Sequence, residues 1–150
     1  MGSNNNQFNA NFNGNGYVIK NLTINRPSID RIGLFGMIKN SVIENVALAG
    51  PNSSIVGRSY TAALVGFAEN NDQIRNAVVS ANVRGLDNVG VLLGYAARNV
   101  NIEDSFTSGS VVGNGQVGCL VGYLYASCSN FKCTANRTLS TAQVTGNSNV

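Results

Sequence analysis

The chain has 150 residues, of which 43% are hydrophobic and 11% charged, a composition typical of a folded domain rather than a disordered segment. Its ten basic residues give a formal net charge of +3 but are spread singly, whereas a nucleic-acid-binding surface needs basic residues gathered on one face. No run reaches the roughly 18 apolar residues of a membrane-spanning helix, so neither nucleic-acid binding nor membrane insertion is expected.

The two ends of the chain indicate how the domain is bounded. The first three residues, Met-Gly-Ser, are typical of a cloning scar, so we expect residues 1–3 to lie outside a single domain over residues 4–150. The last five residues, 146–150, resemble residues 113–117, which lead into a repeat block. We therefore expect the chain to be a fragment of a longer protein.

A four-residue block of the form x-Leu-x-Gly recurs, and its last glycine falls at residues 36, 66, 94 and 122. The intervals of 30, 28 and 28 residues are typical of repeat architectures, whose units bury their apolar faces by stacking. Two strand-like segments and a polar turn follow each block, and the 24 asparagines and 17 glycines favour short strands and tight turns. The pattern predicts an all-β fold, a parallel β-helix or β-solenoid of about five rungs with repeats of about 28 residues.

The second segment of each repeat aligns as an apolar residue, a charged residue and an asparagine-like residue. Parallel rungs stack about 4.8 Å apart, so equivalent positions form columns along the solenoid axis. The apolar column is expected to face the core, and it comprises Ile19, Ile43, Ile74, Ile102 and Phe131. The charged column alternates in sign and faces solvent, where it forms a structural ladder that fixes the register: Lys20, Glu44, Arg75, Glu103 and Lys132.

The third column consists of Asn21, Asn45, Asn76, Asp104 and Cys133. Stacked asparagines can hydrogen-bond side chain to side chain along a solenoid, or each can end a strand at a turn, and the sequence leaves both alternatives open. The block glycines are expected where the backbone bends, or where a neighbouring strand lies too close for a side chain.

An aromatic column follows the block glycines, at Phe67, Tyr95 and Tyr123. Rings on successive rungs can bind a sugar or a partner protein, or they can pack against the core or a sheet edge. Packing is the favoured interpretation, and a glycan-binding column is kept as the alternative.

No catalytic centre, metal site or cofactor is predicted. The chain has no histidine, which excludes Ser-His and Cys-His pairs within it. Glu44 and Glu103 share a face two rungs apart, about 9.6 Å, but Arg75 between them would hold both carboxylates ionised and fill the space that a glycosidase needs for water and sugar. Three cysteines without a CxxC motif disfavour zinc, while Cys128 and Cys133 are candidates for a disulfide in an oxidising compartment.

The repeat blocks resemble the GLUG-type repeats of bacterial and protist surface proteins, which are named for a glycine-leucine-x-glycine core. Residues 12–24 also resemble the segment F-x-G-N-G-x-x-I-x-N-L-x-I that often precedes these repeats. The chain departs from the pattern at Ala63, Val91 and Cys119, where the first glycine is replaced. The resemblance implies a β-solenoid in an extracellular or cell-surface protein and specifies no activity.

From these patterns we expect a non-enzymatic structural or adhesive module of a cell-surface or secreted protein. Two alternatives remain open, a self-assembling extracellular filament subunit and a glycan-binding or polysaccharide-active β-helix. The expected partners are adjacent repeats of the parent protein or end-to-end copies of the chain, with a glycan or a cell-surface protein as a further candidate.

Overall fold

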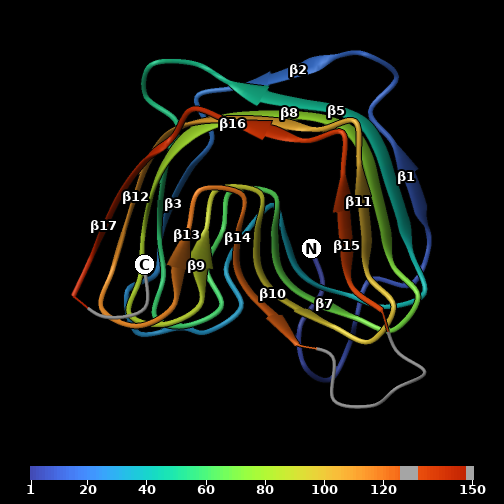
Figure 1. The fold of residues 1–150 in the computed structure, drawn as a ribbon, viewed down its shortest axis with the longest axis horizontal. Helices are drawn as coiled ribbons and strands as arrows, with labels where there is room; N and C mark the ends of the chain where they lie inside the picture. The colour runs from blue at the N-terminus through green and yellow to red at the C-terminus, as the bar shows by residue number, and fades with distance from the viewer. Residues whose placement is uncertain (126–131, 148–150) are drawn as a thin grey trace.

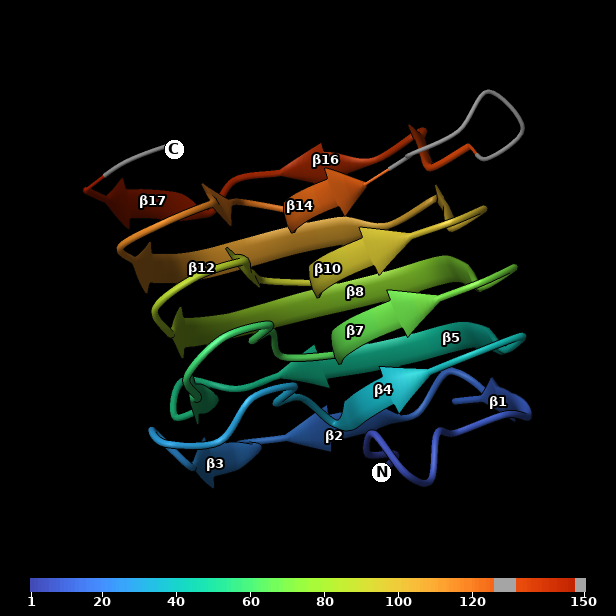
Figure 2. The same ribbon diagram turned by 90° about the horizontal axis from the view of Figure 1, so that it is seen from below.

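The computed structural model describes residues 1–125 and 132–147, which form a solenoid of parallel β-strands. The chain winds through about four turns with a spacing of about 29 residues, so the predicted all-β solenoid is confirmed. Figure 2 shows the turns stacked from β1, β2 and β3 at one end to β16 and β17 at the other. Every pairing between the named strands is parallel, and equivalent residues of successive turns therefore lie side by side.

The largest sheet wraps around three sides of the core, as the arch in Figure 1 shows. Its longest strand, β8, has 12 residues and pairs with strands of all three sides. The strands of this sheet are β1 (Asn11–Asn13), β2 (Val18–Lys20), β3 (Thr23–Asn25), β5 (Val42–Ala49), β6 (Ser54–Val56), β8 (Gln73–Arg84), β11 (Asn101–Glu103), β12 (Phe106–Gly113), β15 (Thr134–Asn136), β16 (Leu139–Ser140) and β17 (Gln143–Gly146).

Two smaller sheets form the remaining side, where the chain folds inward under the arch (Figure 1). The x-Leu-x-Gly blocks lead into the four-stranded sheet. In two turns a short strand precedes the block, and these two strands pair with each other. These strands are β4 (Phe35–Ile38), β7 (Val65–Glu69), β10 (Leu93–Ala97) and β14 (Val121–Tyr125), and the pair is β9 (Val89–Gly90) with β13 (Val117–Gly118).

Columns of aliphatic side chains fill the space between the sheets. Ile43, Ile74 and Ile102 are opposite one another on β5, β8 and β11, and each is fully buried. The block leucines of the middle turns, Leu64 and Leu92, are also fully buried, whereas those of the outer turns are partly buried. The central turns therefore contribute most of the hydrophobic stabilisation, because burial of apolar surface scales with the area removed from water.

The prediction of the isoleucine column was wrong at its first member. Ile19 lies opposite Leu48, and Phe12 is the residue opposite Ile43. At the other end Ala135 lies opposite Ile102, while Phe131 is outside the described residues. The cause is unequal repeat length, because successive turns of this side are 28 to 33 residues apart. The corner loops differ in length between turns. A short sequence motif therefore does not predict which position of the solenoid its residues occupy.

The first residues belong to the same stack as the rest. The Met1 amino group donates to the Leu34 carbonyl at 2.7 Å, and the Gly36 amide donates to the Met1 carbonyl at 2.5 Å. Residues 1–3, expected from sequence to lie outside the domain, thus run beside the start of β4.

The block glycines allow two segments of backbone to touch. A Cβ on Gly66 would lie 2.7 Å from the Arg31 carbonyl carbon and 2.8 Å from the Ile32 amide nitrogen. Gly94 and Gly122 meet the equivalent backbone one and two turns further along, at Tyr60 and Asn88. Because these atoms belong to the main chain, they cannot move aside, and a side chain at this position would clash with them. The glycines are therefore what permits the inward fold.

We predict that Gly66→Ala destabilises the protein by about 3 kcal/mol, the upper end of overpacking costs. Gly33→Ala is the matched control, since its added Cβ meets its nearest atoms at 3.0 to 3.1 Å and the equivalent block positions already hold Ala63, Val91 and Cys119. Chemical denaturation of both variants measures the difference. Equal losses of free energy of unfolding would contradict the close-contact explanation.

Candidate functional site

Three charged residues of the predicted ladder lie side by side on the outer surface. Glu44 of β5 is opposite Arg75 of β8, which is opposite Glu103 of β11. Arg75 Nε donates to Glu44 Oε2 at 2.7 Å, and Asn13 Nδ2 donates to Glu44 Oε1 at 2.9 Å. Both partners of the Glu44–Arg75 pair are partly exposed, so the pair favours the correct register more than it adds stability.

The ladder prediction was wrong for Lys20 and Lys132. Lys20 lies opposite Ala49 on a different side of the solenoid, and Asn13 takes the ladder position of the first turn. At the other end Asn136 is opposite Glu103, while the Lys132 amide donates to Asn99 Oδ1 before β15 begins. Both errors follow from the unequal repeat lengths that displaced the isoleucine column.

We predict that Glu44→Lys lowers the melting temperature more at low salt than at high salt. The change removes the ion pair and sets two cations opposite each other, at a cost of about 1 kcal/mol that salt screens. Glu44→Gln, which retains an acceptor for Asn13, should cost less. Thermal melts at two salt concentrations test this, and a loss independent of salt would rule out an electrostatic ladder.

Asparagines form hydrogen-bonded columns at two corners. In one column the Asn76 amide donates to Asn45 Oδ1 at 2.6 Å, and both residues have left-handed backbone, with φ of 49° and 53°. Both alternatives that the sequence left open therefore hold together, because the same residues turn the chain and hydrogen-bond along the axis. Asp104 and Arg137 continue this column with a two-bonded ion pair, in place of the predicted Cys133. Asn21 belongs to a separate corner, beside Gly50 and Asn52.

The second asparagine column was missed by the sequence analysis. Asn71 donates to Asn40 at 3.3 Å and Asn99 donates to Asn71 at 3.1 Å, again from left-handed backbone. The intervals of 31 and 28 residues match the repeat, and this periodicity was the signal that could have revealed it.

The predicted aromatic column exists as a stack. Phe67 and Tyr95 have ring centroids 4.8 Å apart with an interplanar angle of 15°, and Tyr95 and Tyr123 are 5.6 Å apart at 27°. Tyr60 packs edge-on against Phe67 and Tyr95, and the Arg31 guanidinium lies 5.1 Å from the Phe67 centroid. A sugar binds to the face of a ring, and stacked rings or the Arg31 guanidinium cover the faces of Phe67 and Tyr95, so these two rings are suited to packing at the inward fold. Tyr123 ends the column and is 39% exposed.

Asp72 is a buried carboxylate at the corner before β8. Its Oδ1 accepts from the Ser41 amide at 2.9 Å, and its Oδ2 has no hydrogen-bond partner among the described residues. Burial raises the pKa of Asp72 to about 7, an effect that the backbone amides of Ser41 and Glu69 and the charge of Lys39 oppose and the charge of Glu69 reinforces. The carboxyl group therefore holds its proton in the folded protein at pH values where an exposed aspartate is ionised.

We predict that the stability of the protein falls as the pH rises from about 4 to about 7. In this range the unfolded chain releases the Asp72 proton while the folded chain keeps it, so ionisation favours unfolding, by up to roughly 4 kcal/mol. Asp72→Asn should remove most of this slope and raise the melting temperature at pH 8, whereas Asp87→Asn, at an exposed site, should not. An unchanged pH slope in Asp72→Asn would exclude this carboxyl as the cause.

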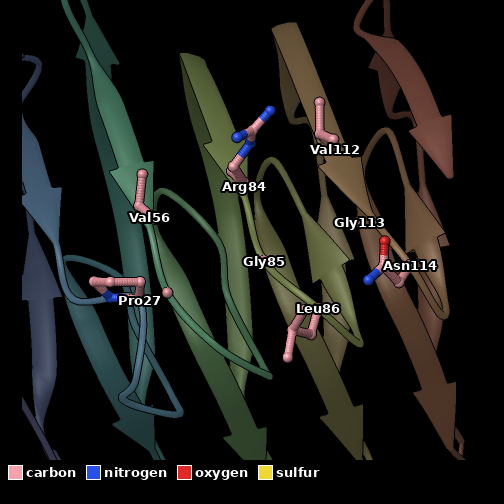
Figure 3. Close-up of a pocket in the computed structure, with 9 residues that line it drawn as sticks. Pro27, Val56, Arg84, Gly85, Leu86, Val112, Gly113 and Asn114 are labelled. Atoms are coloured by element: carbon pink, nitrogen blue, oxygen red, sulfur yellow. The ribbon is translucent and has the colours of Figure 1, made fainter.

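A surface depression lies at the edge of the arch opposite the ladder. It has a volume of about 360 Å³, and Figure 3 shows Arg84 projecting from β8 between Val56 of β6 and Val112 of β12. Pro27 and Leu86 add apolar surface and Asn114 adds an amide; the remaining lining residues are Gly57, Gly85 and Gly113. The nine lining residues include no carboxylate, thiol or hydroxyl, so the depression is suited to binding rather than to acid–base or nucleophilic chemistry.

Other groups that could carry chemistry are few within the described ranges. Residues 1–125 and 132–147 contain no group of three or more acidic, cysteine or histidine residues that could hold a metal ion. Cys128 of the predicted disulfide is outside the described residues. In the part of the chain that the structure covers, no helix has the length and apolar character needed to cross a membrane.

Comparison with known proteins gives two partial matches. The chain is 34% identical over 84 residues to halomucin of Haloquadratum walsbyi, a match that covers 55% of this chain and 1% of halomucin. It is 40% identical over 73 residues to a protein of Evansella cellulosilytica described as a Gly-rich membrane protein, covering 48% of this chain and 8% of that protein. No family model and no solved structure matches. The chain thus spans a small fraction of the length of these relatives.

Proposed function

We propose that the chain is a non-catalytic structural or adhesive repeat module of a cell-surface or secreted protein, built from GLUG-type repeats. The observation that carries the proposal is the unbroken parallel register, in which every turn pairs with the next on the arch and on the inward fold. Such a stack spaces and displays neighbouring parts of a long protein. The names of the relatives, a halomucin and a membrane protein, support a surface location.

The arrangement of the acidic residues supports a non-catalytic role. Glu44 and Glu103 lie on one face with Arg75 opposite both of them, as the sequence predicted. Arg75 is bonded to Glu44, and Glu103 lies 4.0 Å from Arg137. Each carboxylate thus lies beside a cation, and Arg75 takes up the space between them that a glycosidase needs for water and sugar.

The purified chain should leave polysaccharides intact. We expect no rise in reducing ends and no unsaturated uronate absorbance when it is incubated with neutral and acidic polysaccharides. Cleavage that disappears in Glu44→Gln or Glu103→Gln would overturn the proposal and assign a polysaccharide-active enzyme. A melting curve run alongside verifies that each variant is folded.

Self-assembly is a second candidate function, favoured by an apolar stripe on the strands at the top of the arch, where Figure 1 labels β2, β5, β8 and β16. The stripe consists of the opposed outward residues Val18, Ala47, Val78, Phe106 and Leu139. Val18, Val78 and Leu139 are 47%, 43% and 61% exposed, so the stripe offers apolar surface along the whole axis. Exposed apolar surface of this kind favours association between copies of a protein.

Light scattering and negative-stain microscopy test this candidate. If the stripe drives assembly, the apparent mass of the wild-type chain should rise with concentration, while Val78→Lys should remain monomeric. Assembly that is identical in the two proteins would exclude the stripe. A wild-type chain that stays monomeric at all concentrations would support the display module alone.

A further inference from the structure

We propose that the depression around Arg84 binds an acidic polysaccharide, with the carboxylate of a uronate residue held by the Arg84 guanidinium. The proposal rests on the adhesive role proposed above and gives that role a ligand class and a site. It uses three features of one surface, namely an arginine without an internal partner, apolar residues on both sides of it, and a parallel column of polar side chains.

Arg84, like the exposed Arg26, differs from four other arginines of the surface in its charge environment. Arg58, Arg75, Arg98 and Arg137 each form an ion pair with a carboxylate, at distances of 2.5 to 3.7 Å. Arg84 has no carboxylate within 4.0 Å among the described residues, and its side chain is exposed. A guanidinium in this state can bind an external carboxylate through two parallel hydrogen bonds.

The neighbours of Arg84 provide apolar surface on adjacent turns. Val56 and Val112 are directly opposite Arg84 on β6 and β12, and both are only partly buried. Pro27 and Leu86 extend this surface along the same depression, and Leu86 is 45% exposed. The carbon–hydrogen face of a pyranose ring can pack against such side chains while its carboxylate reaches the arginine.

A second depression of about 320 Å³ continues the first along the strands and shares Val56, Arg84 and Val112 with it. It contains the column of Ser54, Asn82 and Ser110, which are directly opposite one another on β6, β8 and β12. Ser110 Oγ donates to Asn82 Oδ1 at 2.7 Å, and Asn82 Nδ2 has no partner among the described residues. These groups can bind sugar hydroxyls beside the arginine.

The shape of the surface favours an extended polysaccharide over a small molecule or a peptide. The two depressions are open and shallow and span three turns, whereas small-molecule sites enclose most of their ligand. The strands here are paired on both sides, so an acidic peptide cannot add to them as a further strand. Turns about 4.8 Å apart also present binding groups at intervals close to the length of one sugar residue.

Calorimetry with the full chain and a short oligogalacturonate tests the proposal. We expect binding that weakens as salt is added, and Arg84→Gln should weaken it about tenfold or more, as for the loss of a charged hydrogen bond. Arg84→Lys should retain part of the affinity because it keeps the charge and loses the two-bonded geometry. Lys20→Gln is the matched control, since it removes one exposed positive charge from another side of the solenoid and should leave the affinity unchanged.

Two further ligands identify what is recognised. The methyl-esterified oligogalacturonate keeps the sugar rings but lacks the charge and should not bind, while polyglutamate keeps the charge but lacks the rings and should bind more weakly. Equal affinity for polyglutamate would assign the site to an acidic peptide and overturn the proposal. No binding of oligogalacturonate, or equal losses in Arg84→Gln and Lys20→Gln, would also overturn it. These outcomes leave the structural module in place, since only cleavage of a polysaccharide contradicts that role.

Discussion

The whole molecule depends on the hydrogen bonds that join each turn to the next in parallel register. Because a single turn has no sheet of its own, its backbone groups are satisfied only by the turns on either side. The register then decides which side chains become neighbours, so the isoleucine column, the paired charges and the asparagine columns are consequences of one alignment. Errors in that alignment would bury polar groups and expose apolar ones on every side at once.

The inward fold is the second constraint, and it follows from the block glycines. Their missing side chains let the backbone of β7, β10 and β14 approach the backbone at Arg31, Tyr60 and Asn88, respectively. The aromatic stack of Phe67, Tyr95 and Tyr123 lies on the same strands, one residue after the block glycines. Tyr60 packs edge-on against Phe67 and Tyr95. The rings therefore stabilise the shape of the cross-section.

The sequence predicted the fold class, the repeat and the central columns, because these depend on apolar periodicity and on glycine positions that recur at nearly equal intervals. It failed at the ends of the columns, where Lys20, Lys132 and Ile19 carry the local motif but lie on another side or at a corner. Corner loops of different length shift the alignment, and a single sequence does not reveal how many residues each loop absorbs.

The candidate binding surface was beyond sequence analysis for a different reason. Arg84, Val56 and Val112 share no motif, and 28 residues separate each from the next along the chain. Their proximity follows from the register alone. Asp72 is similar, since nothing in the sequence distinguishes it from an exposed aspartate, and only the packing of the corner around it makes it a buried acid.

Cysteine cross-linking tests the central claim, the register of the turns, most directly. In a background with the three native cysteines replaced by serine, the pair Asn13→Cys and Glu44→Cys should form a disulfide rapidly, because opposed residues on adjacent strands have Cα atoms within the range that a disulfide bridges. The pair Lys20→Cys and Glu44→Cys, which the local motif would align, should remain reduced. The reverse result would contradict the register on which the account depends.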